Sequence, residues 1–454
     1  MNSEFKALRK FFQTGNTLSY DFRIKQLKKL RASIEKYEDD ILTALKVDMR
    51  KPEYEAYTSE IGLIYQELKD AIDNLDDWMA KKKLPTPLYL KPASSYILPV
   101  PKGVVLIISP WNYPFLLSFS PLVAAIASGN CVMVKPSSKS SYSSKLIARI
   151  IEESFEPDYI RAINCRGEEI PKLVKLADFD HIFFTGSQEV GRSLAGLAGS
   201  KLCPITLELG GKSPTIVDET TDLRLAAKKI TWAKFLNLGQ TCIAPDYILV
   251  KEDIMEDFIA SVQDHIRAFY GDNIMENPDY GRIIDLESFK RLQALLEDSQ
   301  LIFGGDTREE DLFIGPSLIL ADLDSPLMKE EIFGPLMPLI SYRENIEILD
   351  IINLNPNPLA LYLFTEDEAL VEYIMNGVAF GGGCINDTIS HMVNTNLPFG
   401  GLRESGQGNY HSIYGFREFS HFKSLLHSTK NMDIDIKYPP YTRTKKNLSK
   451  FFLK

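Results

Sequence analysis

Three residues of this 454-residue chain, Cys242, Glu208 and Asn112, carry groups that could act on a carbonyl compound. The first is Cys242, in GQTC after an apolar stretch. A cysteine thiolate attacks carbonyl carbon readily, and the preceding glycine-containing turn would present the thiol rather than pack it. A buried structural thiol is the commoner fate of a cysteine, and both Cys131 and Cys203 fit that description. Cys242 is therefore a candidate nucleophile, somewhat better placed than those two.

Glu208 is a carboxylate inside an apolar stretch, ITLELGG. Burial raises the pKa of a carboxyl group toward neutrality, which is the condition for a general base at physiological pH. The two glycines that follow allow a ligand to approach the backbone closely. The alternative is an exposed glutamate on an edge strand. GGKS is not a Walker phosphate loop, because Thr206 stands where its leading glycine is needed.

Two further polar groups follow apolar runs. Asn112, in SPWNYP, could donate its amide N–H to a developing oxyanion, although a turn asparagine among prolines is common. Ser187, in FTGSQEVG, opens a predicted helix whose first N–H groups would form a phosphate site. A plain N-cap role for Ser187 is compatible with that site. The motif lacks GxGxxG, so alone it is weak evidence for a dinucleotide.

The elements that must position these groups alternate along the chain. Predicted strands lie at 104–108, 131–134, 159–164, 181–185 and 204–209, and then at 215–217 and 247–250. Predicted helices between and after them lie at 143–155, 188–198, 223–238 and 254–269. Strands that alternate with helices predict an α/β fold with parallel sheets. Ligands bind such sheets at the carboxyl ends of the strands, where the polar groups above fall.

The two ends of the chain follow other patterns. Residues 20–80 have apolar side chains at helical spacing and predict two amphipathic helices separated near Pro52. Five prolines from Pro85 to Pro101 exclude a helix and predict an extended excursion or edge hairpin. The tail 437–454 has six basic residues and no acidic one. It could touch an anionic membrane, but a solvated or partner-packed tail is the simpler interpretation.

Composition excludes several classes of partner. The net charge of −10 would repel a phosphate backbone, so we expect no nucleic acid. Five cysteines without CxxC favour free thiols in a reducing compartment, the cytoplasm. Six histidines include no HExxH, and we expect no metal. The long uncharged stretch between Lys102 and Lys135 contains helix-breaking prolines, so it predicts buried core rather than a transmembrane segment.

The order of seven motifs is more specific than any one of them. ISPWNYP, VKPS, FTGSQEVG, LELGGKSP, GQTC, EEIFGP and NLPFGG resemble the aldehyde dehydrogenase superfamily along almost the whole chain. GGGCINDT, residues 397–416 and KYPP are similar to its class 3 branch. The resemblance implies an NAD(P)-dependent oxidoreductase that converts an aldehyde to a carboxylic acid through a cysteine thioester.

The resemblance also implies an architecture and a set of roles. A Rossmann-like cofactor domain would comprise 1–83 and 102–207, a catalytic domain 208–405, and a bridging element 84–101 and 406–454 through which class 3 members form homodimers. Cys242 would be the nucleophile, Asn112 and the Cys242 backbone N–H the oxyanion hole, and Glu208 the base that activates water. Cofactor contacts would come from Lys135, Ser138, Gly186, Ser187, Gly191, Glu331 and Phe333.

Two details bear on specificity. NAD-preferring members usually carry a glutamate for the adenosine ribose where this chain has Ser138, followed by Lys139. Without that carboxylate a 2′-phosphate is not repelled, and Lys139 could pair with it, so we predict that NADP is accepted at least as well as NAD. Tyr113, Phe115, Leu116 and residues 385–395 are expected to line an apolar tunnel, which favours medium-chain aliphatic or aromatic aldehydes.

Three alternatives stay open at this point. A CoA-acylating dehydrogenase of the same fold would pass the acyl group to CoA, but such enzymes tend to lack the glutamate at position 208. A non-catalytic binding or structural protein could retain the fold, although Cys242, Glu208, Asn112 and Lys135 are all present. A cofactor-free cysteine hydrolase is suggested by Cys242 alone, and it lacks an obvious histidine partner.

Overall fold

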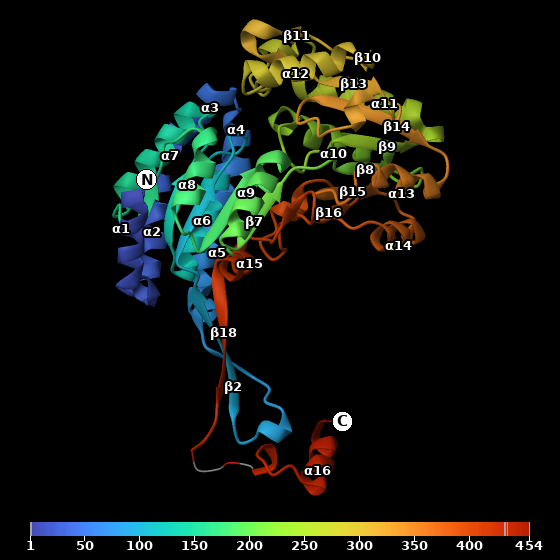
Figure 1. Ribbon diagram of the computed structural model, residues 1–454. Helices are drawn as coiled ribbons and strands as arrows, with labels where there is room; N and C mark the ends of the chain where they lie inside the picture. Colours follow the sequence, from blue (N-terminus) through green and yellow to red (C-terminus); the bar gives the residue numbers. More distant parts are fainter. Residues whose placement is uncertain (1, 431–432, 434, 454) are drawn as a thin grey trace.

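A computed structural model describes residues 2–430, 433 and 435–453. Two large sheets with helices around them form the body, and a narrow three-stranded sheet projects away from it (Figure 1). The α/β class expected from the alternation of strands and helices is the observed one. No helix in the described part of the chain has the length and apolar character needed to cross a membrane.

The first sheet has six strands in the order β17-β7-β6-β3-β4-β5. Its strands are β3 (Val104–Ile108), β4 (Cys131–Lys135), β5 (Ile160–Ala162), β6 (His181–Gly186), β7 (Ile205–Leu209) and β17 (Gly406–Gln407). All neighbours are parallel except β17, which runs antiparallel to β7. Every residue of β3 and β4 is buried, as expected for parallel strands covered on both faces.

Ten helices accompany this sheet. They are α1 (Asn2–Gln13), α2 (Tyr20–Lys36), α3 (Glu38–Met49), α4 (Glu53–Ala56), α5 (Gly62–Met79), α6 (Leu116–Ser128), α7 (Ser141–Ser154), α8 (Ile170–Leu176), α9 (Gln188–Ser200) and α15 (Ser412–Glu418). Helix α6 is buried along its whole length, because it runs between the sheet and helices α2 and α5. Figure 1 shows this half in blue to green, with α15 returning to it from the far end of the chain.

The second sheet has seven strands in the order β10-β13-β14-β9-β8-β15-β16. Its strands are β8 (Pro214–Val217), β9 (Tyr247–Lys251), β10 (Gln300–Phe303), β13 (Ser317–Leu320), β14 (Leu336–Tyr342), β15 (Ala360–Phe364) and β16 (Gly382–Ile385). Its helices are α10 (Leu223–Phe235), α11 (Met255–Tyr270), α12 (Leu286–Glu297), α13 (Asn345–Asn353) and α14 (Glu368–Gly377). Strands β11 (Thr307–Arg308) and β12 (Phe313–Ile314) form a separate two-stranded ladder.

The proline-rich segment is extended, as predicted. Strands β1 (Lys82–Leu84), β2 (Ser94–Pro101) and β18 (Ser420–His427) form the projecting antiparallel sheet. β18 pairs with β2 along eight residues, so backbone hydrogen bonds join the proline-rich segment to the C-terminal region. Helix α16 (Arg443–Leu453) lies at the distal end of this projection (Figure 1).

The prediction of two helices over residues 20–80 was wrong in detail. The first breaks at Tyr37, where the backbone leaves helical geometry between α2 and α3. The second contains a π-turn at Tyr57–Ile61 between α4 and α5. Apolar spacing continues across both irregularities, because both flanks pack into one core, so periodicity could not reveal them. Helix α1 was not predicted at all.

Candidate active site

Cys242 lies in a loop that is held by its own polar side chains. After α10 ends, Asn237 and Leu238 adopt left-handed backbone angles, φ 49° and 56°. The amide of Gln240 fixes this turn, because it donates to the carbonyls of Asn237 and Arg282, each at 3.1 Å, and accepts from the N–H of Ile284 at 3.1 Å. The cysteine is thus presented by a rigid loop.

The surroundings of the Cys242 thiol favour its neutral form. Burial, with smaller contributions from the nearby carboxyl groups of Glu331 and Glu208, raises the pKa of the thiol to about 12. The backbone N–H groups of Cys242 and Ile243 act in the opposite sense, because they donate toward the sulfur. Those N–H groups could also donate to an oxyanion formed next to the sulfur.

Glu208 lies on β7, the strand next to the edge strand of the first sheet, and not on the edge itself. β7 has β6 on one side and β17 on the other, where Glu208 is opposite Gly406. The side chain is buried, and neither carboxylate oxygen has a hydrogen-bond partner. Burial, with a smaller contribution from Glu418, holds the pKa of the Glu208 carboxyl well above its usual range. These are the conditions for a general base near neutral pH.

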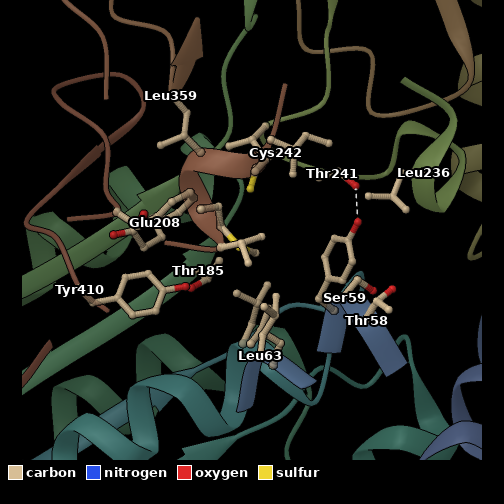
Figure 2. A pocket seen from close by; sticks show the side chains of 18 of the residues that line it. Thr58, Ser59, Leu63, Thr185, Glu208, Leu236, Thr241, Cys242, Leu359 and Tyr410 are labelled. Atoms are coloured by element: carbon tan, nitrogen blue, oxygen red, sulfur yellow. Dashed lines mark hydrogen bonds between the residues drawn. The ribbon is translucent and has the colours of Figure 1, made fainter. Parts of the chain in front are cut away.

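Cys242 and Glu208 both face an apolar cavity of about 300 Å³ (Figure 2). Its wall comprises Thr58, Ser59, Leu63, Tyr113, Leu116, Leu117, Thr185, Glu208, Leu209, Trp232, Leu236, Thr241, Cys242, Ile243, Leu359, Ile389, Met392, Val393, Phe399 and Tyr410. Glu208 is the one Asp, Glu, Lys or Arg side chain in that wall. The dashed line at Thr241 in Figure 2 marks its 2.6 Å hydrogen bond with the Tyr113 hydroxyl.

A second cavity, of about 260 Å³, lies on the other side of the same residues. Its wall comprises Pro110, Trp111, Asn112, Leu117, Thr185, Gly186, Ser187, Glu208, Leu209, Gly210, Cys242, Glu331 and Phe333. The two cavities share Cys242, Glu208, Thr185, Leu117 and Leu209. A group in either cavity therefore has access to the thiol and the carboxyl group.

Asn112 lies in the second cavity beside Cys242. Its side-chain nitrogen donates to the backbone carbonyl of Gln240 at 3.0 Å. An amide nitrogen carries two N–H groups, so the second one is available to an oxyanion. The loop after β3 and the loop before Cys242 are therefore joined directly.

Four of the seven predicted cofactor residues line the second cavity: Gly186, Ser187, Glu331 and Phe333. Lys135 ends β4, Ser138 is exposed just beyond it, and Gly191 is buried in the first turn of α9, so these three lie outside its wall. Ser187 is the N-cap of α9 and accepts from the N–H of Val190.

The second cavity has features that suit a dinucleotide. The Glu331 Oε1 atom is buried without a hydrogen-bond partner, and burial raises the pKa of this carboxyl to about 8. A β-carbon at position 210 would overlap the Glu331 carboxylate, so the glycine there leaves room for that carboxylate in the cavity wall. Phe333 packs edge-on against Trp111, with ring centroids 5.6 Å apart. A carboxylate oxygen without a partner suits ribose hydroxyls, and the aromatic wall suits a flat ring.

Lys139 has partners that the sequence did not suggest. Its ammonium group forms ion pairs with Asp285 at 2.7 Å and Glu287 at 3.4 Å. These carboxylates hold the pKa of Lys139 above its usual range even though partial burial acts against it. A 2′-phosphate would therefore have to compete with Asp285 for this lysine.

The apolar wall also differs from the predicted tunnel. Tyr113 and Leu116 line it as expected, and so do Ile389, Met392 and Val393 from the segment 385–395. Phe115 was a wrong prediction, because its ring is fully buried and packs near Phe119 instead. Sequence reasoning missed Thr185 and Tyr410, which lie near Glu208 in Figure 2; no local pattern marked either.

Fold and site together describe an α/β protein with a cysteine in the wall that an apolar cavity shares with a second cavity. The model of the aldehyde dehydrogenase family matches residues 2–425, and the chain belongs to this family. It is therefore an oxidoreductase that oxidises an aldehyde to a carboxylic acid. The CoA-acylating, non-catalytic and hydrolase alternatives receive no support from these comparisons.

Individual relatives place the chain near the class 3 branch. It is 44% identical to 4,4'-diaponeurosporen-aldehyde dehydrogenase of Staphylococcus aureus, over 100% of this chain and 99% of that one. Aldehyde dehydrogenase family 3 comG of Dictyostelium discoideum is 41% identical, over 98% and 95% of the two chains.

Solved structures give the same picture. The substrate-bound state of Staphylococcus aureus AldH has a TM-score of 0.97 at 44% identity and covers 99% of both chains. Glyceraldehyde-3-phosphate dehydrogenase GapN of Methanocaldococcus jannaschii, complexed with NADP, has a TM-score of 0.84 at 27% identity and covers 94% of both chains. The family uses NAD or NADP.

Proposed function

We propose that Cys242 is the nucleophile that binds the aldehyde covalently and carries the acyl group as a thioester while NAD(P)⁺ is the oxidant, and that Glu208 prepares the water that cleaves the thioester. The observation that carries this proposal is the position of both side chains in the wall shared by the two cavities. An aldehyde in the apolar cavity and a nicotinamide in the other would then meet at the sulfur. NAD(P)⁺ supplies a hydride acceptor when it is bound.

The first half of the reaction forms the thioester. The thiol of Cys242 loses its proton to solvent, its sulfur bonds to the aldehyde carbon as the carbonyl π bond breaks, and the carbonyl oxygen becomes an oxyanion. The amide of Asn112 and the backbone N–H of Cys242 donate to that oxygen. The carbon–hydrogen bond then breaks with its electron pair leaving as hydride, the carbonyl re-forms, and the acyl group stays on the sulfur.

The second half releases the acid. Glu208 accepts a proton from water, the resulting hydroxide bonds to the thioester carbon, and the carbon–sulfur bond breaks. The raised pKa of the Glu208 carboxyl lets it take up that proton near neutral pH. Net, aldehyde and water give carboxylic acid, one proton and one hydride equivalent.

Rapid mixing with saturating NAD and aldehyde tests this assignment. Wild-type enzyme and Glu208→Gln should both release one equivalent of reduced cofactor per site in a first turnover. In Glu208→Gln the later turnovers should be slower by about 10²–10⁴-fold, because only the water step needs the carboxylate. A variant that keeps the wild-type steady-state rate would contradict the role of Glu208.

The cavity wall supports an apolar substrate. We propose medium-chain aliphatic or aromatic aldehydes, because burying a charged substrate there would leave it unpaired. The Staphylococcus aureus relative is named for a diaponeurosporen aldehyde, which is in line with an apolar substrate. Turnover measured across an aldehyde chain-length series tests this class, and the rate should rise with length until the cavity is filled.

For the cofactor we propose that NADP is accepted at least as well as NAD. Support comes from Ser138, an exposed neutral side chain that cannot repel a 2′-phosphate, and from the adjacent Lys139. The ion pair of Lys139 with Asp285 works against this preference, because the phosphate must displace a carboxylate. A hundredfold higher kcat/KM with NAD, about 2.7 kcal/mol, would contradict the proposal.

The domain division and the homodimer are also proposals. Residues 1–83 and 102–207 would bind the cofactor, 208–405 would carry out catalysis, and 84–101 with 406–454 would bridge two subunits. Within 406–454, β17 and α15 pack with the first sheet and its helices, so the bridging contacts would come from β18 onward. The outer edge of β18 has no strand beside it in the projecting sheet. Residues 81–101 and 420–454 contain twelve basic and two acidic residues, whereas the whole chain has a net charge of −10. A basic projection and an acidic body are complementary between two copies.

Sedimentation of the full chain, and of a chain that ends at residue 428, tests the dimer. The full chain should sediment as a dimer that weakens with salt, because much of the attraction would be electrostatic. Cytoplasmic location remains a proposal as well, supported by the presence of all five cysteines as free thiols.

A further inference from the structure

A buried ion pair lies behind the wall of the active site without touching either cavity. Lys51 follows α3 directly, and Glu60 lies in the π-turn before α5. Their Nζ and Oε1 atoms are 2.6 Å apart, and both side chains are fully buried. Neither residue lines the apolar cavity or the second cavity, so neither can contact the aldehyde or the cofactor there.

Each partner of the pair holds the loop that carries Asn112. The Lys51 ammonium group donates to the backbone carbonyl of Asn112 at 3.0 Å and lies 4.2 Å from the ring centroid of Tyr113. The second carboxylate oxygen of Glu60 accepts from the backbone N–H groups of Phe115 and Leu116, at 2.9 and 3.3 Å. Those N–H groups open helix α6, which has no side-chain cap of its own.

The same segment also reaches the loop of Cys242. The carbonyl of Asn112 accepts a second bond from the side chain of Asn237, at 3.1 Å. The backbone N–H of Asn237 donates to the carboxylate of Glu55 at 3.0 Å. Residues 51–60 thus join the loop of the oxyanion donor and the loop of the nucleophile, although these loops lie next to different sheets.

Stability does not explain an ion pair in this place. Burying two charges costs so much desolvation that apolar replacements of such pairs are often neutral or stabilising. A charged pair does, however, fix geometry, because each of its bonds is directional and short. Here the bonds end on the backbone of Asn112 itself and of Phe115 and Leu116, which follow it.

We propose that Lys51, held by Glu60, is a positioning residue that sets the Asn112 amide at its distance from the Cys242 sulfur and backbone N–H. The inference rests on the proposed role of Asn112 as an oxyanion donor. Without Lys51, the Asn112 carbonyl keeps only the Asn237 bond, and the loop can shift. An oxyanion donor that moves by a fraction of an ångström loses most of its effect, because the bond must fit the transition state.

A double-mutant cycle with the full-length enzyme and NAD tests this proposal. Lys51→Met combined with Glu60→Gln removes both charges of the pair, so that neither partner is left buried without the other. We expect kcat to fall at least tenfold, with unchanged NAD affinity by calorimetry and a melting temperature near that of the wild type. Asn112→Ala should lower kcat by about 10²–10³-fold. Added to Asn112→Ala, the Lys51→Met/Glu60→Gln change should lower kcat less than threefold further.

The outcomes separate this inference from the proposed function. Multiplicative losses in the triple variant, or full activity in Lys51→Met/Glu60→Gln, would overturn the positioning role. Full activity in Asn112→Ala would instead overturn the oxyanion assignment. If Lys51→Met/Glu60→Gln does not fold, the single variant Lys51→Met takes its place in the cycle, because the Glu60 carboxyl, whose pKa burial raises, keeps its bonds from Phe115 and Leu116. Arg9→Met is the matched control, because it breaks the remote Arg9–Asp180 pair and should leave kcat unchanged.

Discussion

The carboxyl group of Glu208 and the thiol of Cys242 line the same two cavities, although they come from different parts of the fold. Glu208 belongs to β7 of the six-stranded sheet, and Cys242 precedes β9 of the seven-stranded sheet. Glu208 is buried, Cys242 is partly buried, and the carboxyl group raises the pKa of the thiol. Ionisation of either group therefore disfavours ionisation of the other.

Replacing Cys242 by alanine should abolish aldehyde oxidation. We expect kcat to fall at least about a thousandfold, because no other group would form the covalent bond to substrate. Cys384→Ala is the matched control, since that thiol is half-buried outside both cavities, 3.6 Å from Nδ1 of His391. Equal loss in both variants would show a structural rather than chemical effect.

Alkylation of Cys242 by iodoacetamide should report its raised pKa. With a pKa near 12, the thiolate fraction, and hence the rate, should rise about tenfold per pH unit from pH 7 to 9. Glu331→Gln should speed the reaction several-fold at pH 9, because the Glu331 carboxyl, with a pKa of about 8, is ionised there and opposes the thiolate. Mass spectrometry of the modified peptide gives both rates. A slower variant would contradict the assigned sign.

The stability of Glu208→Gln relative to the wild type should depend on pH. The folded-state pKa of Glu208 is raised, so its ionisation opposes the folded state. Below the usual pKa of 4.5 the Glu208 carboxyl is protonated in both the folded and the unfolded state, so it costs the wild type no stability. As pH rises from there through the folded-state pKa, the unfolded state loses this proton more readily, and the free energy of unfolding of the wild type falls. The melting temperature of the glutamine variant minus that of the wild type should therefore grow from pH 5 to pH 8. A constant difference would argue against a raised pKa.

Ser138→Glu should shift cofactor preference toward NAD. A carboxylate at this exposed position would repel the 2′-phosphate of NADP and could accept from the ribose hydroxyls of NAD. We expect the kcat/KM ratio of NAD to NADP to rise at least tenfold, which is about 1.4 kcal/mol. Ser138→Gln, with similar size and no charge, is the control. An equal shift in both variants would point to shape instead of charge.

Val393→Asp should penalise long apolar aldehydes selectively. Val393 is 44% exposed at the rim of the apolar cavity, so the substitution spares the core. A charge beside the substrate chain must be desolvated, and KM should rise about tenfold for aldehydes of roughly ten carbons. Butanal, which need not reach the rim, should be unaffected. Val393→Asn separates polarity from charge, and a uniform rise in KM for all aldehydes would contradict the prediction.

The local pattern of apolar residues alone predicted most strands of the two large sheets up to residue 250. Each strand predicted between residues 104 and 250 is present, with shifted ends, because buried parallel strands are continuous apolar runs. The order of the motifs was enough for the family, since it depends on the whole chain and not on one residue. Both features follow from the order of residues along the chain and do not depend on how distant segments pack.

The tertiary structure decided what these residues touch. Lys51 and Glu60 had no signal in the sequence, since an ordinary lysine and glutamate become functional only where α3 and the π-turn meet the Asn112 loop. Lys139 was expected to be able to pair with a 2′-phosphate, yet Asp285, far along the chain, is its partner. Periodicity records whether a side chain is buried, whereas the identity of its neighbour depends on how distant segments pack, and packing is a property of the folded chain alone.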